Sequence, residues 1–133
     1  MKAVNVYYLH HAFGPLNGMT DSEYEAALTS WDPYSPRRYH EFLARELLPS
    51  YALWDAASQA NVLDALQYAL ATGRVDFVAV LADQRYSPMP IPDDPREVFE
   101  ILWQLLAPDR SYHADDTATW QERNVREEAV IRG

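Results

Sequence analysis

The stretch that most constrains the fold runs from Asp94 to Leu106, because it is apolar around most of a helical circumference. The polar residues Glu97, Glu100 and Gln104 align on one narrow face. Apolar residues recur at spacings of three and four and fill the rest: Val98, Phe99, Ile101, Leu102, Trp103, Leu105 and Leu106. A helix of this kind must be buried on most sides. We expect Asp94 to cap it and Pro95 to open it.

Three further segments carry helical apolar stripes. They are residues 20–31, 35–47 and 50–72. Ser35 followed by Pro36 is typical of a helix start, with serine as the N-cap and proline in the first turn. Pro49 is expected to end that helix. Gly73 is well placed for the left-handed residue that ends the following one.

Two segments are rich in β-branched and aromatic residues and predict strands, at Ala3–Leu9 and Val75–Ala82. For Val75–Ala82 a helical continuation is the competing interpretation, and the short length favours a strand. The long intervals between strands allow parallel pairing through a helical crossover.

The end of the chain, Ser111–Gly133, is polar. Residues 117–132 fit a helix, but their apolar positions follow a helical stripe poorly, so a strand or hairpin is an open alternative. Taken together, the pattern predicts an α+β fold. Four or five helices would pack around a small sheet in one helix-rich domain covering residues 1–133.

The loop Tyr86–Pro95 contains Pro88, Pro90 and Pro92. Prolines this close together exclude helix and sheet interior, so we expect an extended, polyproline-like loop. The loop combines rigidity, apolar side chains and acids, which suits docking because little entropy is lost on binding. The alternative interpretation is a simple connector.

The charge balance narrows the choice of partner. Asp and Glu number 20 against 11 Lys and Arg, giving a net charge of −9. Such a surface repels phosphate backbones and anionic membranes, so nucleic acid and membranes are not expected partners. Basic proteins and metal ions remain. The absence of cysteine, of a signal-like start and of a long apolar run predicts a cytoplasmic protein.

No catalytic signature is present in the sequence. The serines lack a GxSxG elbow, and four scattered glycines form no phosphate-binding loop. We therefore expect neither an enzyme nor a cofactor. The alternative is a small metal-dependent hydrolase that uses His10, His11 and His113 with nearby Asp residues, although no HExxH-type spacing supports it.

Size, acidity and missing chemistry together are similar to those of small cytosolic inhibitors that neutralise toxins, such as bacterial immunity proteins. This similarity is one of character and not of residues. The leading hypothesis is a stoichiometric inhibitor of a basic toxin or effector. Its expected contacts are Tyr34, Tyr86, Asp93, Asp94, Asp115 and Asp116. A third alternative is a homo-oligomeric accessory protein in which Val98–Leu106 packs across a symmetric interface.

Overall fold

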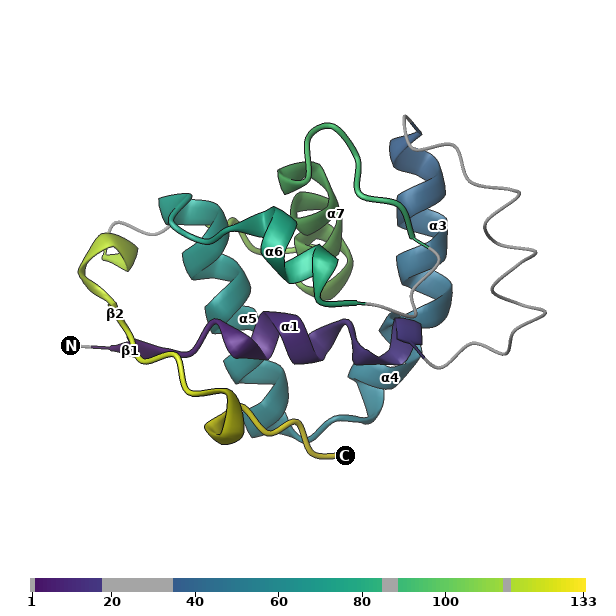
Figure 1. Ribbon diagram of the computed structural model, residues 1–133. Coiled ribbons are helices and arrows are strands. Elements are labelled where there is room, and N and C mark those ends of the chain that lie inside the picture. The colour runs from purple at the N-terminus through teal and green to yellow at the C-terminus, as the bar shows by residue number, and fades with distance from the viewer. Residues whose placement is uncertain (1, 18–34, 85–88, 114–115) are drawn as a thin grey trace.

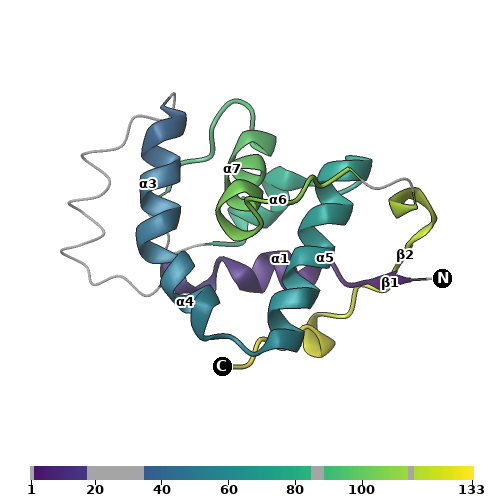
Figure 2. The same ribbon diagram turned by 180° about the vertical axis from the view of Figure 1, so that it is seen from behind.

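Helix α7 (Arg96–Leu106) lies between α3 (Pro36–Glu46) and α5 (Ala56–Thr72) and packs against both (Figures 1 and 2). The computed structural model describes residues 2–17, 35–84, 89–113 and 116–133. The fold class is α+β, as predicted. The other elements are β1 (Ala3–Val4), α1 (Tyr7–Ala12), α4 (Leu48–Leu53), α6 (Phe77–Ala82), β2 (Gln121–Glu122) and 3-10 turns at Gly14–Asn17, Thr117–Thr119 and Arg126–Glu128.

The wide apolar face of α7 enters the core as the sequence predicts. Phe99 and Leu102 are fully buried, and Val98, Ile101 and Trp103 are almost so. They join a cluster that includes Phe13 at the end of α1, Phe42 and Leu43 of α3, and Leu66 of α5. The homo-oligomer alternative requires the apolar residues of Val98–Leu106 at an interface between copies. Most of them are already buried inside a single copy.

Two predicted helix boundaries are confirmed. The Ser35 hydroxyl accepts a hydrogen bond from the Arg38 amide, and Pro36 stands in the first turn of α3. Gly73 adopts a φ of 66° and donates its amide hydrogen to the Ala69 carbonyl, which ends α5. Both boundaries depend on local backbone chemistry that the residue type itself supplies.

The predicted strand Ala3–Leu9 is wrong beyond Val4. The chain turns at Asn5, whose side-chain oxygen accepts a hydrogen bond from the Tyr7 amide at 3.1 Å, and α1 begins there. Asparagine offers the backbone this local partner in place of a sheet ladder. The β-branched and aromatic residues that suggested a strand therefore form a short helix.

The predicted strand Val75–Ala82 is also wrong, and its helical alternative is right in type. Residues Phe77–Ala82 form α6, a helix separate from α5. The carboxylate of Asp76 accepts a hydrogen bond from the Ala79 amide at 3.1 Å and so caps its first turn. A good N-cap outweighs the strand propensity of Phe77, Val78 and Val80.

The predicted helix 50–72 is two helices. α4 ends at Leu53, and Asp55 caps α5 by accepting a hydrogen bond from the Ser58 amide at 2.7 Å. Pro49 does not end α3, which already stops at Glu46; it stands in the first turn of α4. A first-turn proline loses no helical hydrogen bond, so it can begin a helix as readily as end one.

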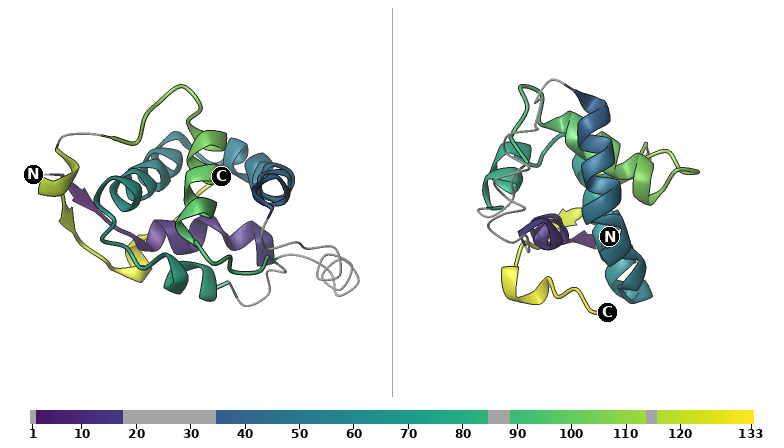
Figure 3. Two further views of the ribbon diagram at one scale, coloured as in Figure 1. Left: turned by 90° about the horizontal axis from the view of Figure 1, so that it is seen from above. Right: turned by 90° about the vertical axis from the view of Figure 1, so that its right-hand side faces the viewer.

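The segment 116–133, which we call the C-terminal strap, follows the N-terminal residues (Figures 1 and 3). A helix over residues 117–132 is not formed. The strand alternative is confirmed at β2, which pairs with β1 in parallel, Ala3 opposite Gln121 and Val4 opposite Glu122.

No helix in the described part of the chain has both the length and the apolarity to cross a membrane. The predicted helix 20–31 lies outside the described residues.

Side chains of other elements hold the strap by binding its backbone. Asn5 donates to the Val125 carbonyl at 2.8 Å, and His11 Nδ1 lies 2.6 Å from the Ala129 carbonyl oxygen. The Arg132 amide donates to the Ser58 hydroxyl at 2.9 Å. The extended strap thus finds the backbone partners that a helix would have supplied internally.

Trp120 fixes the strap to the core. Its indole ring is 7% exposed, stacks on Tyr68 of α5 with ring centroids 6.5 Å apart, and lies 4.4 Å from the Lys2 ammonium group. Burial of so large a ring removes much apolar area from water. The position of the strap therefore depends strongly on this one side chain.

We expect Trp120→Ala to lower the free energy of unfolding by about 3–5 kcal/mol, because it leaves a cavity beside Tyr68. Urea denaturation followed by far-ultraviolet circular dichroism measures this loss. Glu127→Ala, at an exposed strap position, serves as the control and should change stability by less than about 0.5 kcal/mol. Equal, small effects of both substitutions would show that the strap is not anchored by Trp120.

Candidate functional site

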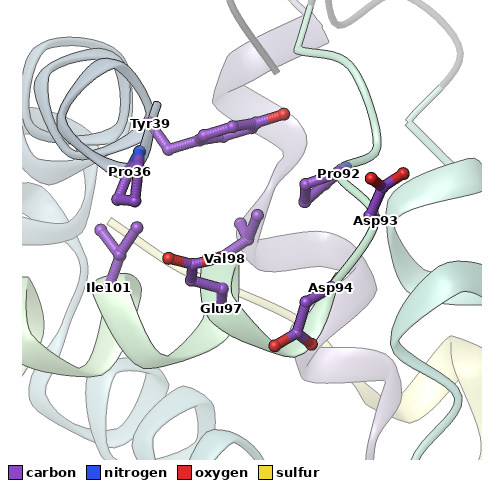
Figure 4. Close-up of a pocket in the computed structure, with 8 residues that line it drawn as sticks. All are labelled: Pro36, Tyr39, Pro92, Asp93, Asp94, Glu97, Val98 and Ile101. Atoms are coloured by element: carbon purple, nitrogen blue, oxygen red, sulfur yellow. The ribbon is translucent and has the colours of Figure 1, made fainter. Parts of the chain in front are cut away.

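A pocket of about 160 Å³ opens where α3 and α7 begin and the proline-rich loop passes between them (Figure 4). We call it the acidic pocket. Its lining residues are Pro36, Tyr39, Pro92, Asp93, Asp94, Glu97, Val98 and Ile101. Two separate stretches of the chain therefore build it, the start of α3 and the continuous segment that runs from the proline-rich loop into α7.

The proline-rich loop is tied to α3 at the pocket. The Tyr39 hydroxyl donates a hydrogen bond to the Pro90 carbonyl at 2.8 Å. Pro92 is buried, and Pro90 and Pro92 each have a fixed φ. Because the loop is restrained in this way, the acids that follow it are presented at a defined position.

The floor of the acidic pocket is apolar. Tyr39, Val98 and Ile101 are all buried and belong to the main core cluster. Figure 4 shows Pro36 and Ile101 at one end of the opening and Pro92, Asp93 and Asp94 at the other, with Glu97 between them. Ile91, on the loop beside Pro92, leaves 42% of its surface exposed.

The rim of the acidic pocket carries three carboxylates, from Asp93, Asp94 and Glu97. None of them forms an ion pair or a side-chain hydrogen bond with any residue in the described ranges. The neighbouring Arg96 points elsewhere, since it pairs with Glu100 at 2.9 Å and donates to the Leu70 carbonyl. Negative charge is therefore concentrated here, and no cation in the described ranges pairs with it.

Most other acids in the described ranges have partners. Asp64 pairs with Lys2, Glu41 with Arg37, Glu46 with Arg45 and Glu128 with Arg123. Asp55 and Asp76 cap helices, and Glu122 accepts a hydrogen bond from Tyr68. The acidic pocket differs from these sites because three carboxylates with no side-chain partner among the described residues line one apolar opening.

Asp94 does not cap α7, contrary to the sequence prediction. The N-cap position is Pro95, which forms no side-chain cap, and Asp94 contributes only its carbonyl oxygen, to the Glu97 amide at 3.2 Å. The aspartate side chain is thereby left at the rim of the pocket. Figure 4 shows the carboxylates of Asp93 and Asp94 pointing in different directions, so they are not arranged as a facing acid–base pair.

The remaining predicted contacts do not join this site. Asp116 is exposed beside the 3-10 turn Thr117–Thr119, at the opposite end of the molecule from α3 (Figure 1). Tyr34, Tyr86 and Asp115 lie outside the described residues. Of the six predicted contacts, the structure brings together Asp93 and Asp94.

The histidines of the hydrolase alternative have other partners or lie apart. His11 binds the strap backbone, and His113 is exposed beside the ring of Tyr112. Within the described ranges no three His, Asp or Glu side chains are grouped so that they could hold a metal ion.

His10 takes part in a small polar cluster with α6 and the strap. Its Nδ1 lies 2.9 Å from Asp83 Oδ2, and Arg126 Nη1 lies 3.3 Å from the same oxygen. The hydrogen bond from His10, aided by Arg126 and opposed by burial, holds the pKa of Asp83 below its ordinary value. The guanidinium group of Arg126 also stacks 4.6 Å from the Tyr7 ring centroid. This cluster ties α1, α6 and the strap together.

Sequence reasoning missed Glu97, Tyr39, Pro36 and Ile101 as pocket residues. A signal for Glu97 was present: it follows Asp93 by four residues and Asp94 by three, and such positions are neighbours once a helix begins near Pro95. Tyr39 and Ile101 follow ordinary core stripes. Nothing in the local sequence indicates that the start of α3 lies against the start of α7.

Comparison with known protein families, with curated proteins and with solved structures found no match to this chain. Its function must therefore be argued from its own geometry.

We expect Asp94→Ala to leave the free energy of unfolding within about 0.5 kcal/mol of wild type, because this carboxylate has no side-chain partner in the described part of the chain. The matched substitution Asp76→Ala, which removes the cap of α6, should cost about 1 kcal/mol. Urea denaturation of both variants measures the difference. A loss for Asp94→Ala as large as that for Asp76→Ala would mean that Asp94 has a structural role.

The lowered pKa of Asp83 makes a prediction about acid stability. A carboxyl whose pKa is lower in the folded state stabilises that state above its unfolded pKa, and this stabilisation is lost as pH falls through the folded pKa. Asp83→Asn should therefore reduce stability at neutral pH, and the difference from wild type should vanish in strong acid. Urea midpoints measured stepwise from about pH 7 to about pH 2 test this. Asp109→Asn, at an exposed side chain with no partner in the described ranges, should show no such convergence.

Proposed function

We propose that this protein is a stoichiometric inhibitor that binds a basic protein, in the manner of an immunity protein, and that it acts in the cytoplasm. The observation that carries this proposal is the acidic pocket, where three carboxylates that have no side-chain partner in the described ranges lie along part of an apolar opening. Isolated charges at a surface are ordinary. Charges gathered around an apolar floor are the arrangement that a protein interface uses.

The size of the pocket favours a protein partner over a small molecule. Sites for drug-sized ligands enclose roughly 300–1,000 Å³. The acidic pocket encloses about 160 Å³, enough for one inserted side chain. The exposed Ile91 beside it can contribute apolar area to a wider contact.

The net charge of −9 favours a partner that carries a net positive charge. An acidic protein attracts a basic one over long distances and speeds encounter between them, and the effect weakens as salt is added. The same charge repels nucleic acid. Affinity itself would come from the few side chains that become desolvated at the pocket.

The experiment compares two triple variants that change the net charge by the same amount. The pocket variant is Asp93→Asn, Asp94→Asn, Glu97→Gln. The control variant is Asp109→Asn, Glu127→Gln, Glu128→Gln, at exposed acids outside the pocket. Each is immobilised beside wild type and exposed to a lysate of the source cells at low salt.

We expect wild type and the control variant to retain the same basic protein, and the pocket variant to bind it at least about tenfold more weakly, a change of about 1.4 kcal/mol. Added salt should elute it. One equivalent of this protein should then suppress the activity of the captured partner. The proposal fails if no basic protein is retained, if both triple variants behave alike, or if the partner stays fully active in the complex.

A further inference from the structure

The acidic pocket has two chemical zones that together fit one kind of side chain. The floor, made by Tyr39, Val98 and Ile101, is apolar and buried. The rim, made by Asp93, Asp94 and Glu97, is anionic (Figure 4); Asp93 and Asp94 are exposed, and Glu97 is half-buried. A guest must therefore bury an apolar stem and hold a cationic group at the entrance.

The volume limits the guest to one side chain. A cavity of about 150 Å³ accommodates a molecule the size of benzene. The acidic pocket, at about 160 Å³, is of the same size. A peptide backbone or a second side chain would remain outside, where Ile91 and the proline-rich loop form the surface.

Lysine and arginine both combine an apolar stem with a cationic end. Arginine fits this pocket better for two reasons. Its guanidinium group is planar and less strongly hydrated than an ammonium group, so it costs less to bring beside the aromatic ring of Tyr39. It also presents several N–H donors in a fixed fork, which can serve more than one carboxylate at the same time.

The pocket is already shaped before a guest arrives. The hydrogen bond from Tyr39 to Pro90 and the fixed φ of Pro92 hold the loop against α3. The rim acids have no side-chain partner in the described ranges, so they are available to a guest. A pre-formed anionic mouth pays little ordering entropy when it binds a cation.

We infer that the acidic pocket receives a single arginine side chain of the partner protein. This inference rests on the proposed function, because it names the group through which that partner is recognised. The stem lies on Val98 and Ile101, the guanidinium group lies beside Tyr39, and the carboxylates of Glu97, Asp93 and Asp94 neutralise it.

The test uses N-acetyl-arginine amide as the probe, titrated into the ¹⁵N-labelled protein at low salt and followed by amide chemical shifts. We expect saturable shifts confined to Ile91, Asp93, Asp94, Glu97, Val98 and Ile101, with a dissociation constant on the order of 1 mM for a ligand of this size. N-acetyl-norleucine amide, which has an apolar side chain and no charge, should bind at least about tenfold more weakly. N-acetyl-lysine amide should fall between them.

Variants complete the test. Glu97→Gln should weaken the arginine probe severalfold, and Asp109→Asn should leave its binding unchanged; an unaltered spectrum away from the pocket shows that each variant is folded. Linear, scattered shifts, or equal binding of arginine and norleucine probes, would overturn the inference. Failure of the arginine inference can be distinguished from failure of the proposed function. If the pocket variant loses the captured protein while the arginine probe does not bind, the inhibitor proposal stands and the arginine inference is wrong.

Discussion

The burial of α7 between α3 and α5 is the constraint on which the rest of the structure depends. Its apolar residues occupy most of a helical circumference, so other elements must surround it on several sides. With α3 packed along one side, the first turns of α3 and α7 lie next to each other, and the proline-rich loop that leads into α7 must pass between them. The acidic pocket is a consequence of this packing. Its floor is the edge of the core, and its rim is the end of the loop that enters α7.

Local chemistry explains which parts of the fold could be predicted. Ser35, Pro36 and Gly73 define helix ends through their own backbone preferences, and all three act as expected. Asp76 caps α6, and the Asn5 side chain accepts a hydrogen bond from the first amide of α1, whose N-cap is Val6. Both residues precede β-branched and aromatic residues that also suit strands. The choice between helix and strand was decided there by a single side-chain hydrogen bond. The strap could not be predicted, because its backbone partners, such as Asn5 and Ser58, are distant in sequence.

Two of the three acids of the candidate site, Asp93 and Asp94, were expected from the sequence, whereas Glu97 and the shape of the pocket were not. Asp93 and Asp94 follow a proline-rich loop, and this position alone suggested that they are presented to a partner. The apolar floor needed Tyr39 and Ile101, which are distant in sequence and meet only because α3 packs on α7. Asp94 illustrates the limit most clearly. Its sequence context fits an N-cap, yet Pro95 takes that position, and the carboxylate lies at the pocket mouth instead.

The placement of the acids carries an energetic argument. Like charges held close together repel one another, and a carboxylate without a cation gains little from the folded state. In this protein, acids such as Asp64, Asp83 and Glu100 have paired cations nearby, so the chain is able to neutralise them. Asp93, Asp94 and Glu97 are adjacent along the loop and the first turn of α7, and Arg96, between them in sequence, is committed to Glu100. Within the described ranges no basic side chain pairs with any of the three, although the start of α7 favours negative charge through the helix dipole. A cationic group of the partner proposed above would supply the missing pairing, and the apolar floor beside it would strengthen the attraction by excluding water.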